Sequence, residues 1–343
     1  MDARGEMTQT SGNHQDFAQR ALILLDEQKR EWAMLRDGAA ALDDIQTRNI
    51  PVNGFNFRLQ YNPQRIASTA AKVDAKAVAQ RRCFLCPANL PPEQRGVAFG
   101  DDYLILCNPY PIFPQHFTIP HKAHLPQRIA DSFAAMLDLA RAMHERYTVF
   151  YNGPRCGASA PDHLHFQAGD KGFMTIESEY DRLKGAPIVA TRDVAIFAPR
   201  SARPFVSIES ADREAAIAAF KVLYRNLNNI SPAPPAEEPM MNVIVNFAAA
   251  ANATAATTAD AAGTWRTIVL PRIKHRPSFY TAHGDARILL SPGTVDLGGV
   301  CILPVEQDFQ RLREHHLQQM LEEVMLPPEP FSRLSDALAA VIK

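Results

Sequence analysis

The sequence lacks any long, uninterrupted apolar run. No stretch of its 343 residues approaches the roughly 18 apolar residues that a membrane-spanning helix needs. The first residues, MDARGEMTQTSGNHQD, also lack the apolar core of a signal peptide. Because 46% of the residues are hydrophobic, the chain can nevertheless bury a sizeable core. We therefore expect a soluble, cytoplasmic protein with no membrane partner.

An excess of charge of one sign is lacking as well. The formal net charge is −1, so nothing in the overall balance indicates nucleic acid or an anionic surface as a partner. Cysteine is sparse, and its count of five is odd, which excludes a dense disulfide scaffold. This usage favours a reducing compartment, in which the cysteines are buried thiols or metal ligands.

The chain is long enough for two domains or for one domain duplicated. Apolar residues at helical spacing predict helices over 16–42, 126–147, 211–229 and 306–325. Short apolar or alternating runs predict strands over 55–62, 103–107, 116–119, 148–153, 203–210, 241–247, 265–272 and 298–304. The second half repeats the order of elements of the first, so we expect an α+β fold of two similar halves, each an antiparallel sheet with flanking helices.

The stretch PDHLHFQAG (161–169) places polar side chains at every second position. In a strand, His163, His165 and Gln167 would share one face, and the apolar residues between them would share the other. A strand with one buried face and one solvent-exposed face explains the alternation, but it does not explain why two of the polar residues are histidines. The motif therefore predicts a chemical role for the polar face.

The preceding loop, YNGPRCGASAPD, is rich in small residues that let backbone N–H groups approach an anion closely. A loop of this kind that leads into a histidine-bearing strand indicates phosphoryl transfer through a histidine nucleophile. We expect His165 to be the nucleophile, because it is the central member. Gln167 would hold a phosphoryl oxygen by a hydrogen bond without acting as a proton donor.

Cys83 and Cys86 form a Cys-x-x-Cys pair, which is weak evidence by itself. Together with two histidines it would complete a tetrahedral zinc site, with His163 as one ligand. The other histidine would come from IPHKAHLPQ, as His121 or His124. Such a closed site would be structural, and the alternative is two ordinary buried thiols.

A basic cluster, LPRIKHRP (270–277), follows a predicted strand. It is either an exposed basic turn or a positive clamp for a substrate phosphate, with Lys274 and Arg276 as the binding residues.

Three segments together resemble the histidine-triad (HIT) superfamily, in its transferase and phosphorylase branch. CFLCPANLP resembles the Cys-x-x-Cys-Pro-x-Asn segment of this branch, NPYPIFPQHFTIP its Asn-x-Tyr-Pro…His…Ile-Pro strand pair, and DHLHFQA its His-x-His-x-Gln motif. The resemblance implies a nucleotidyl-enzyme intermediate on His165, with Gln167 and Ser159 at the phosphoryl group and Asn108 near the ribose. Glutamine in the third position implies a transferase or phosphorylase, where a third histidine would imply a hydrolase. We place His124 in the zinc site, with His121 as the alternative.

The resemblance also implies an organisation of the chain. We expect an N-terminal tail and helix over 1–54, a HIT-like catalytic half over 55–200, and a second HIT-like half with C-terminal helices over 201–343. The substrate would be a nucleoside diphosphate sugar or a dinucleoside polyphosphate, and the acceptor phosphate or a sugar phosphate. The rival hypotheses are a nucleotide-binding sensor without turnover and a zinc-dependent interaction module. The base, the sugar and the acceptor stay open, as does a homodimer.

Overall fold

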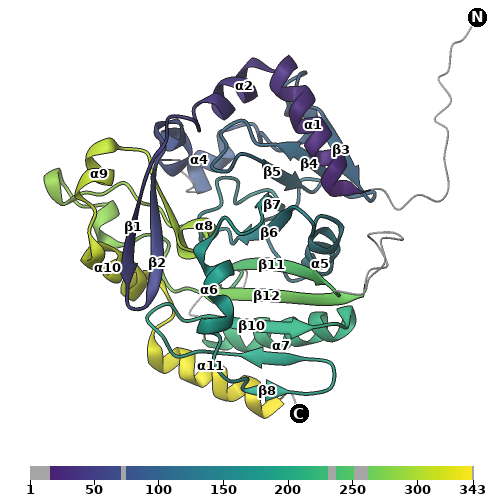
Figure 1. Cartoon of the computed structure of the whole chain (residues 1–343), viewed down its shortest axis with the longest axis vertical. Helices are drawn as coiled ribbons and strands as arrows, with labels where there is room; N and C mark the ends of the chain where they lie inside the picture. Colours follow the sequence, from purple (N-terminus) through teal and green to yellow (C-terminus); the bar gives the residue numbers. More distant parts are fainter. Residues whose placement is uncertain (1–15, 71–74, 231–236, 251–261, 342–343) are drawn as a thin grey trace, which may run out of the picture.

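The computed structural model describes residues 16–70, 75–230, 237–250 and 262–341, and its mixture of helices and sheets confirms the α+β class (Figure 1). The expected tail at 1–15 lies outside these residues. Within them, a large sheet has the spatial order β3 (Gly96–Phe99), β4 (Tyr103–Cys107), β5 (His116–Pro120), β7 (His165–Asp170), β6 (Tyr147–Asn152), β11 (Met241–Ala249), β12 (Gly263–Pro271), β10 (Val206–Ser210), β9 (Ala195–Phe197) and β8 (Val189–Ala190).

All neighbouring strands of the large sheet are antiparallel. The strands of the two expected halves form one continuous sheet: β6 pairs with β11, and β9, which falls in the expected first half, pairs with β10 of the second. The division of the chain into segments at residues 55 and 201 stays a prediction.

A smaller sheet consists of β1 (Gln46–Val52), β2 (Phe55–Tyr61) and β13 (Val300–Leu303). β1 was not expected, although the sequence carries its signal. The two residues that connect it to β2, Asn53 and Gly54, have φ angles of 47° and 82°, as a tight hairpin turn requires. β13 runs parallel to β2, so the C-terminal part of the chain completes a sheet begun near the N-terminus.

The longer helices differ from the prediction in their ends. The expected helix over 16–42 breaks at the buried, extended Trp32, and the one over 126–147 begins only at Phe133. No helix among the described residues is long and apolar enough to cross a membrane. The helices are α1 (Phe17–Glu31), α2 (Ala33–Ala40), α3 (Ile66–Thr69), α4 (Ala75–Ala79), α5 (Phe133–Ala142), α6 (Thr175–Leu183), α7 (Arg213–Ile230), α8 (Thr294–Leu297), α9 (Glu306–Arg311), α10 (Glu314–Val324) and α11 (Pro328–Val341).

Two hydrophobic cores cover the two faces of the large sheet. On one face pack α1, α5, α7 and α11, together with Leu164, Phe166 and Ala168 from the β7 segment. On the other face pack the small sheet, α6, α9 and α10. Because side chains alternate along a strand, His165 and Gln167 point away from the first core and toward the layer of the small sheet.

Candidate active site

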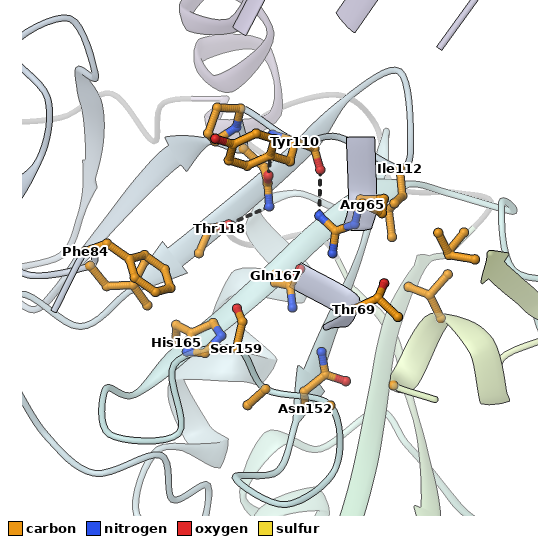
Figure 2. Close-up of a pocket in the computed structure, with 18 of the residues that line it drawn as sticks. Arg65, Thr69, Phe84, Tyr110, Ile112, Thr118, Asn152, Ser159, His165 and Gln167 are labelled. Atoms are coloured by element: carbon orange, nitrogen blue, oxygen red, sulfur yellow. Dashed lines mark hydrogen bonds between the residues drawn. The ribbon is translucent and has the colours of Figure 1, made fainter. Parts of the chain in front are cut away.

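A cavity of about 620 Å³ opens on this second face of the large sheet. Residues of β5, β6 and β7 line it from the sheet side, and the segment around α8 lines it from the C-terminal part of the chain. Figure 2 shows His165, Ser159, Gln167 and Asn152 gathered around one part of this cavity. A volume of this size suits a ligand as large as a nucleotide.

His165 is the buried histidine of the cavity wall, with 3% of its surface exposed. Its Nδ1 lies 2.8 Å from the carbonyl oxygen of His163. Since a carbonyl can only accept, Nδ1 carries the proton and Nε2 keeps its lone pair. Burial lowers the pKa of His165 to about 4, so the imidazole is neutral at neutral pH. A neutral ring with a free Nε2 lone pair is the form that can act as a nucleophile.

Gln167 lies on the same face of β7, and its amide has a fixed orientation. The backbone N–H of Ile112 donates to Nδ1 of His116, so the proton of this ring is on Nε2. That Nε2–H donates to Oε1 of Gln167 over 3.0 Å. The Nε2 amide group of Gln167 is therefore the end left for the cavity, where it can only donate. Burial lowers the pKa of His116 to about 3, which keeps this ring neutral.

A second amide, that of Asn152 at the end of β6, is oriented in the same way. Its Oδ1 accepts from the backbone N–H of Thr294 over 2.7 Å and from Nδ2 of Asn242 over 2.9 Å. Asn152 lines the cavity and is only 8% exposed, and its Nδ2 is the remaining donor. Two amide donors thus lie beside His165, on neighbouring strands.

The small-residue loop between β6 and β7 forms the next part of the wall, with Gly157, Ala158 and Ser159 facing the cavity. Gly157 has a φ of 98°, and a Cβ atom there would lie 2.7 Å from the Cα of Gly293. Only glycine therefore lets this loop pack against the α8 segment. The loop lies beside His165, as its sequence predicted, and the contact of Ser159 with a phosphoryl group stays a prediction.

Asn108 also lines the cavity, but both ends of its amide are engaged within the protein. Nδ2 donates to Oγ1 of Thr118, and Oδ1 accepts from the backbone N–H of Tyr110. These bonds fix the turn after β4. A role of Asn108 near a ribose stays a prediction.

The structure separates the two members of the expected basic clamp. Arg276 lines the cavity, where its Nε donates to Oγ of Ser291 and its guanidinium lies over the Tyr280 ring. Lys274 does not line it, and its ammonium instead pairs with Glu323 on α10. The expectation that Lys274 lies at the substrate therefore needs correction, because the turn after β12 sends its side chain toward α10.

The expected metal ligands Cys83, Cys86, His124 and His163 form one cluster, with their ligand atoms all within 4.8 Å of one another. Nδ1 of His163 lies 3.2 Å from Sγ of Cys83, and Nδ1 of His124 lies 3.2 Å from Sγ of Cys86. His121 lies outside this cluster, with its ring edge-on to Tyr103. The geometry therefore favours His124 over His121.

The donor set fits a metal ion. Nε2 of His163 donates to the carbonyl of His121 over 2.7 Å, so its Nδ1 lone pair faces the two thiols. Nε2 of His124 lies 3.7 Å from the Asp162 carboxylate, an arrangement common for metal-binding histidines. Two thiols and two imidazoles are a donor set that zinc favours in closed, four-ligand sites. The cluster can thus hold a metal at the start of β7.

Several residues of the site were not expected from the sequence. His116, Asn152 and Thr294 fix or form the donors around His165, and Arg81 and Arg65 line the same cavity. His116 had a signal, since it alternates with Thr118 on a predicted strand. Thr294 had none, because its position depends on packing across the sheet.

Comparison with known proteins extends this description. A family model described as "Domain of unknown function (DUF4922)" matches residues 24–170, which include the cysteine pair and the His-x-His-x-Gln motif. No curated protein matches the sequence.

The structure is similar to that of yeast Ap4A (diadenosine tetraphosphate) phosphorylase. The TM-score is 0.52 at 15% identity, over 86% of this chain and 94% of the yeast chain. For the yeast complex with AMP, the TM-score is 0.51 at 14% identity, over 88% of this chain and 97% of the yeast chain. For the complex with Ap4A, the TM-score is 0.51 at 15% identity, over 86% of this chain and 96% of the yeast chain. The likeness thus extends along nearly the whole yeast chain, and this chain shares the fold of that phosphorylase.

Proposed function

We propose that this protein is a nucleotidyltransferase of the phosphorylase type (EC 2.7.7-like), which works through a nucleotidyl-histidine intermediate. The observation that carries the proposal is the buried, neutral His165, which has a free Nε2 lone pair and lines the same cavity as two amides oriented as donors. The fold supports it, since the yeast protein of similar structure is a phosphorylase that has been solved with AMP and with Ap4A.

In the first step, Nε2 of His165 attacks the α-phosphorus of a nucleoside diphosphate sugar or a dinucleoside polyphosphate. The P–N bond forms as the bond from phosphorus to the bridging oxygen breaks, and a sugar phosphate or nucleotide leaves with the electron pair. In the second step, an oxygen of phosphate or of a sugar phosphate attacks the same phosphorus, and the P–N bond breaks. The imidazole is then again neutral.

The residues around His165 have separate tasks in this proposal. The amides of Gln167 and Asn152 donate to the equatorial phosphoryl oxygens, where negative charge develops. Arg81 and Arg276, which both line the cavity, supply positive charge. Ser159 contacts the phosphoryl group, and Asn108 lies near the ribose. Without a third imidazole, nothing at the position of Gln167 can protonate a leaving group, which favours transfer over hydrolysis.

Cys83, Cys86, His124 and His163 would hold a structural zinc ion. The ion would fix the Cys83–Cys86 turn and the His124 segment to His163, two residues before β7 begins at His165. With four protein ligands it has no open position for a substrate, so the reaction would not pass through it. Cytoplasmic location and a homodimer stay predictions.

The direct test is intact-protein mass spectrometry. The protein is mixed with UDP-glucose, GDP-glucose, ADP-glucose or diadenosine tetraphosphate in a buffer free of phosphate. We expect a mass gain of one nucleoside monophosphate with at least one of the four, and the gain identifies the nucleotide. The gain should be absent from His165→Ala and present in His144→Ala, a matched control whose buried ring lies at the end of α5.

Other outcomes discriminate the rival hypotheses. Nucleotide binding without any mass gain would favour the non-catalytic sensor. An adduct that persists in His165→Ala would exclude His165 as the nucleophile.

A further inference from the structure

Gln127 connects the two strands that carry His165 and Asn152. It lies in the segment between β5 and α5, and 1% of its surface is exposed. Its side-chain amide is fully engaged with backbone. Oε1 accepts from the N–H of His165 over 2.8 Å, and Nε2 donates to the carbonyls of His165 and Asn152 over 3.0 and 2.8 Å.

The side-chain amide of Gln127 replaces the backbone hydrogen bonds that one further residue pair between β6 and β7 would make. The ladder between β6 and β7 ends at Phe150 and Gln167, and its continuation would place Asn152 opposite His165. In such an antiparallel pair the two residues would bond directly through their own N–H and C=O groups. Here the carboxamide of Gln127 lies between them and supplies the N–H and C=O groups instead. The two strands are therefore bridged beside the cavity by a side chain.

The Gln127 bridge fixes the backbone of His165, the residue whose ring orientation matters most for the proposed reaction. The ring of His165 is oriented by its Nδ1–H bond to the carbonyl of His163, two residues earlier. The position of Nε2 therefore depends on the backbone from His163 to His165. On one side β5 fixes this backbone, through the pairing of Pro120 with His165. On the other side the amide of Gln127 fixes it.

We propose that Gln127 is a positioning residue for His165, and that its amide sets where Nε2 lies relative to the donors of Gln167 and Asn152. This inference rests on the proposed function, in which His165 is the nucleophile. Only a carboxamide fits this position, because it supplies an acceptor and a donor together. A carboxylate would place an oxygen against two carbonyl oxygens, and an apolar side chain would leave three buried backbone groups without partners.

The test compares Gln127→Met and Gln127→Glu with Gln28→Met. Gln28 is the matched control, since it is fully buried and its amide donates to a backbone carbonyl, that of Glu93, far from His165 in the sequence. The substrates are the four compounds of the mass-spectrometry test above. We expect the maximal rate at which His165 takes up the nucleotidyl group to fall by about ten- to a hundredfold in both Gln127 variants. The half-saturating concentration should stay unchanged, and Gln28→Met should react at the wild-type rate.

A second readout does not depend on activity. In protein with ¹⁵N-labelled histidine, the ring nitrogens of His165 should report a single Nδ1–H tautomer in the wild type and averaging of tautomers in Gln127→Met. His165→Asn identifies the signals. Gln127→Glu keeps the acceptor for the His165 N–H, so it carries the test if Gln127→Met does not fold.

The outcomes separate the two proposals. If the wild type is labelled and folded Gln127 variants react at the same rate, the role of Gln127 is wrong while the proposed function stands. If the wild type is never labelled, the proposed function fails. The tautomer of His165 then decides the inference alone, and an unchanged single tautomer in Gln127→Met would overturn it.

Discussion

His163 and His165 lie two residues apart, yet each ring leaves a different nitrogen free. His163 donates through Nε2 to the carbonyl of His121, so its Nδ1 faces the two thiols. His165 donates through Nδ1 to the carbonyl of His163, so its Nε2 is left for the cavity. In both cases a backbone carbonyl decides which nitrogen keeps its lone pair. Two identical side chains thus expose different nitrogens: that of His163 can bind a metal, and that of His165 can attack an electrophile, as the proposed function requires.

Removing each of the two rings in turn should separate the roles of His163 and His165 most completely. His165→Ala should lose all nucleotide labelling, keep its bound metal and melt close to the wild type. His163→Ala should lose the metal and melt lower by about 5 °C or more, because the Cys83–Cys86 turn is then no longer tied to β7. Metal content by plasma mass spectrometry and a thermal scan measure both effects.

A chelator should sharpen the same contrast. It should lower the melting temperature of the wild type and of His165→Ala, and leave that of His163→Ala where it was. Equal metal content in the two variants would contradict the assignment of separate roles to the two rings.

Gln167→Glu should have the next largest effect, because it replaces a donor beside His165 by a carboxylate facing the phosphoryl oxygens. We expect the rate of labelling to fall by about 10²- to 10³-fold, as when one donor to a developing charge is lost. Single-turnover kinetics measure it. Gln115→Glu is the matched control: Gln115 accepts from the Tyr147 hydroxyl, which a carboxylate can also do, and it does not line the cavity. A rate that falls equally in both variants would count against a donor role for Gln167.

A third ring, that of His116, extends the comparison, since both of its nitrogens are engaged. Burial lowers its pKa to about 3 in the folded state, so below pH 6.5 the unfolded chain binds a proton that the folded protein does not. Folding stability is therefore lost as the pH falls, and this histidine alone contributes a loss of about 2 kcal/mol between pH 7 and pH 5.

Urea unfolding at the two pH values measures this contribution. In His116→Gln, stability at pH 7 should be lower than in the wild type, and the further loss on going to pH 5 should be smaller by about that amount. An identical loss in the variant would show that His116 is not the group responsible.

Much of the site could be predicted because its signals are local. The alternation in residues 163–168 predicts which side chains share a face, and Leu164, Phe166 and Ala168 indeed lie in the core under α5 while His165 and Gln167 line the cavity. The Cys-x-x-Cys pair, taken together with His163, likewise predicts a metal cluster. The choice between His121 and His124 as its fourth ligand needed the geometry, because both lie within one short, irregular segment.

The expected helix over 126–147 shows where periodicity misleads. Its first residues could continue the helical pattern, but the backbone N–H of Ile129 bonds to Glu238 and the amide of Gln127 bonds to His165. These partners lie far away in the sequence, and the helix begins only at Phe133. Lys274 is a similar case, since only the position of α10 decides that it pairs with Glu323.

The sequence by itself determined the α+β class, the face of β7 that lines the cavity, and the residue types of the cluster that can hold a metal. These follow from alternation, spacing and composition, which act over a few residues. The tertiary structure decided the tautomers of the histidines, the orientation of the Gln167 and Asn152 amides, and the bridge made by Gln127. Each of these depends on a hydrogen-bond partner on another element, because a buried polar group takes its donor or acceptor role from whatever the fold places opposite it.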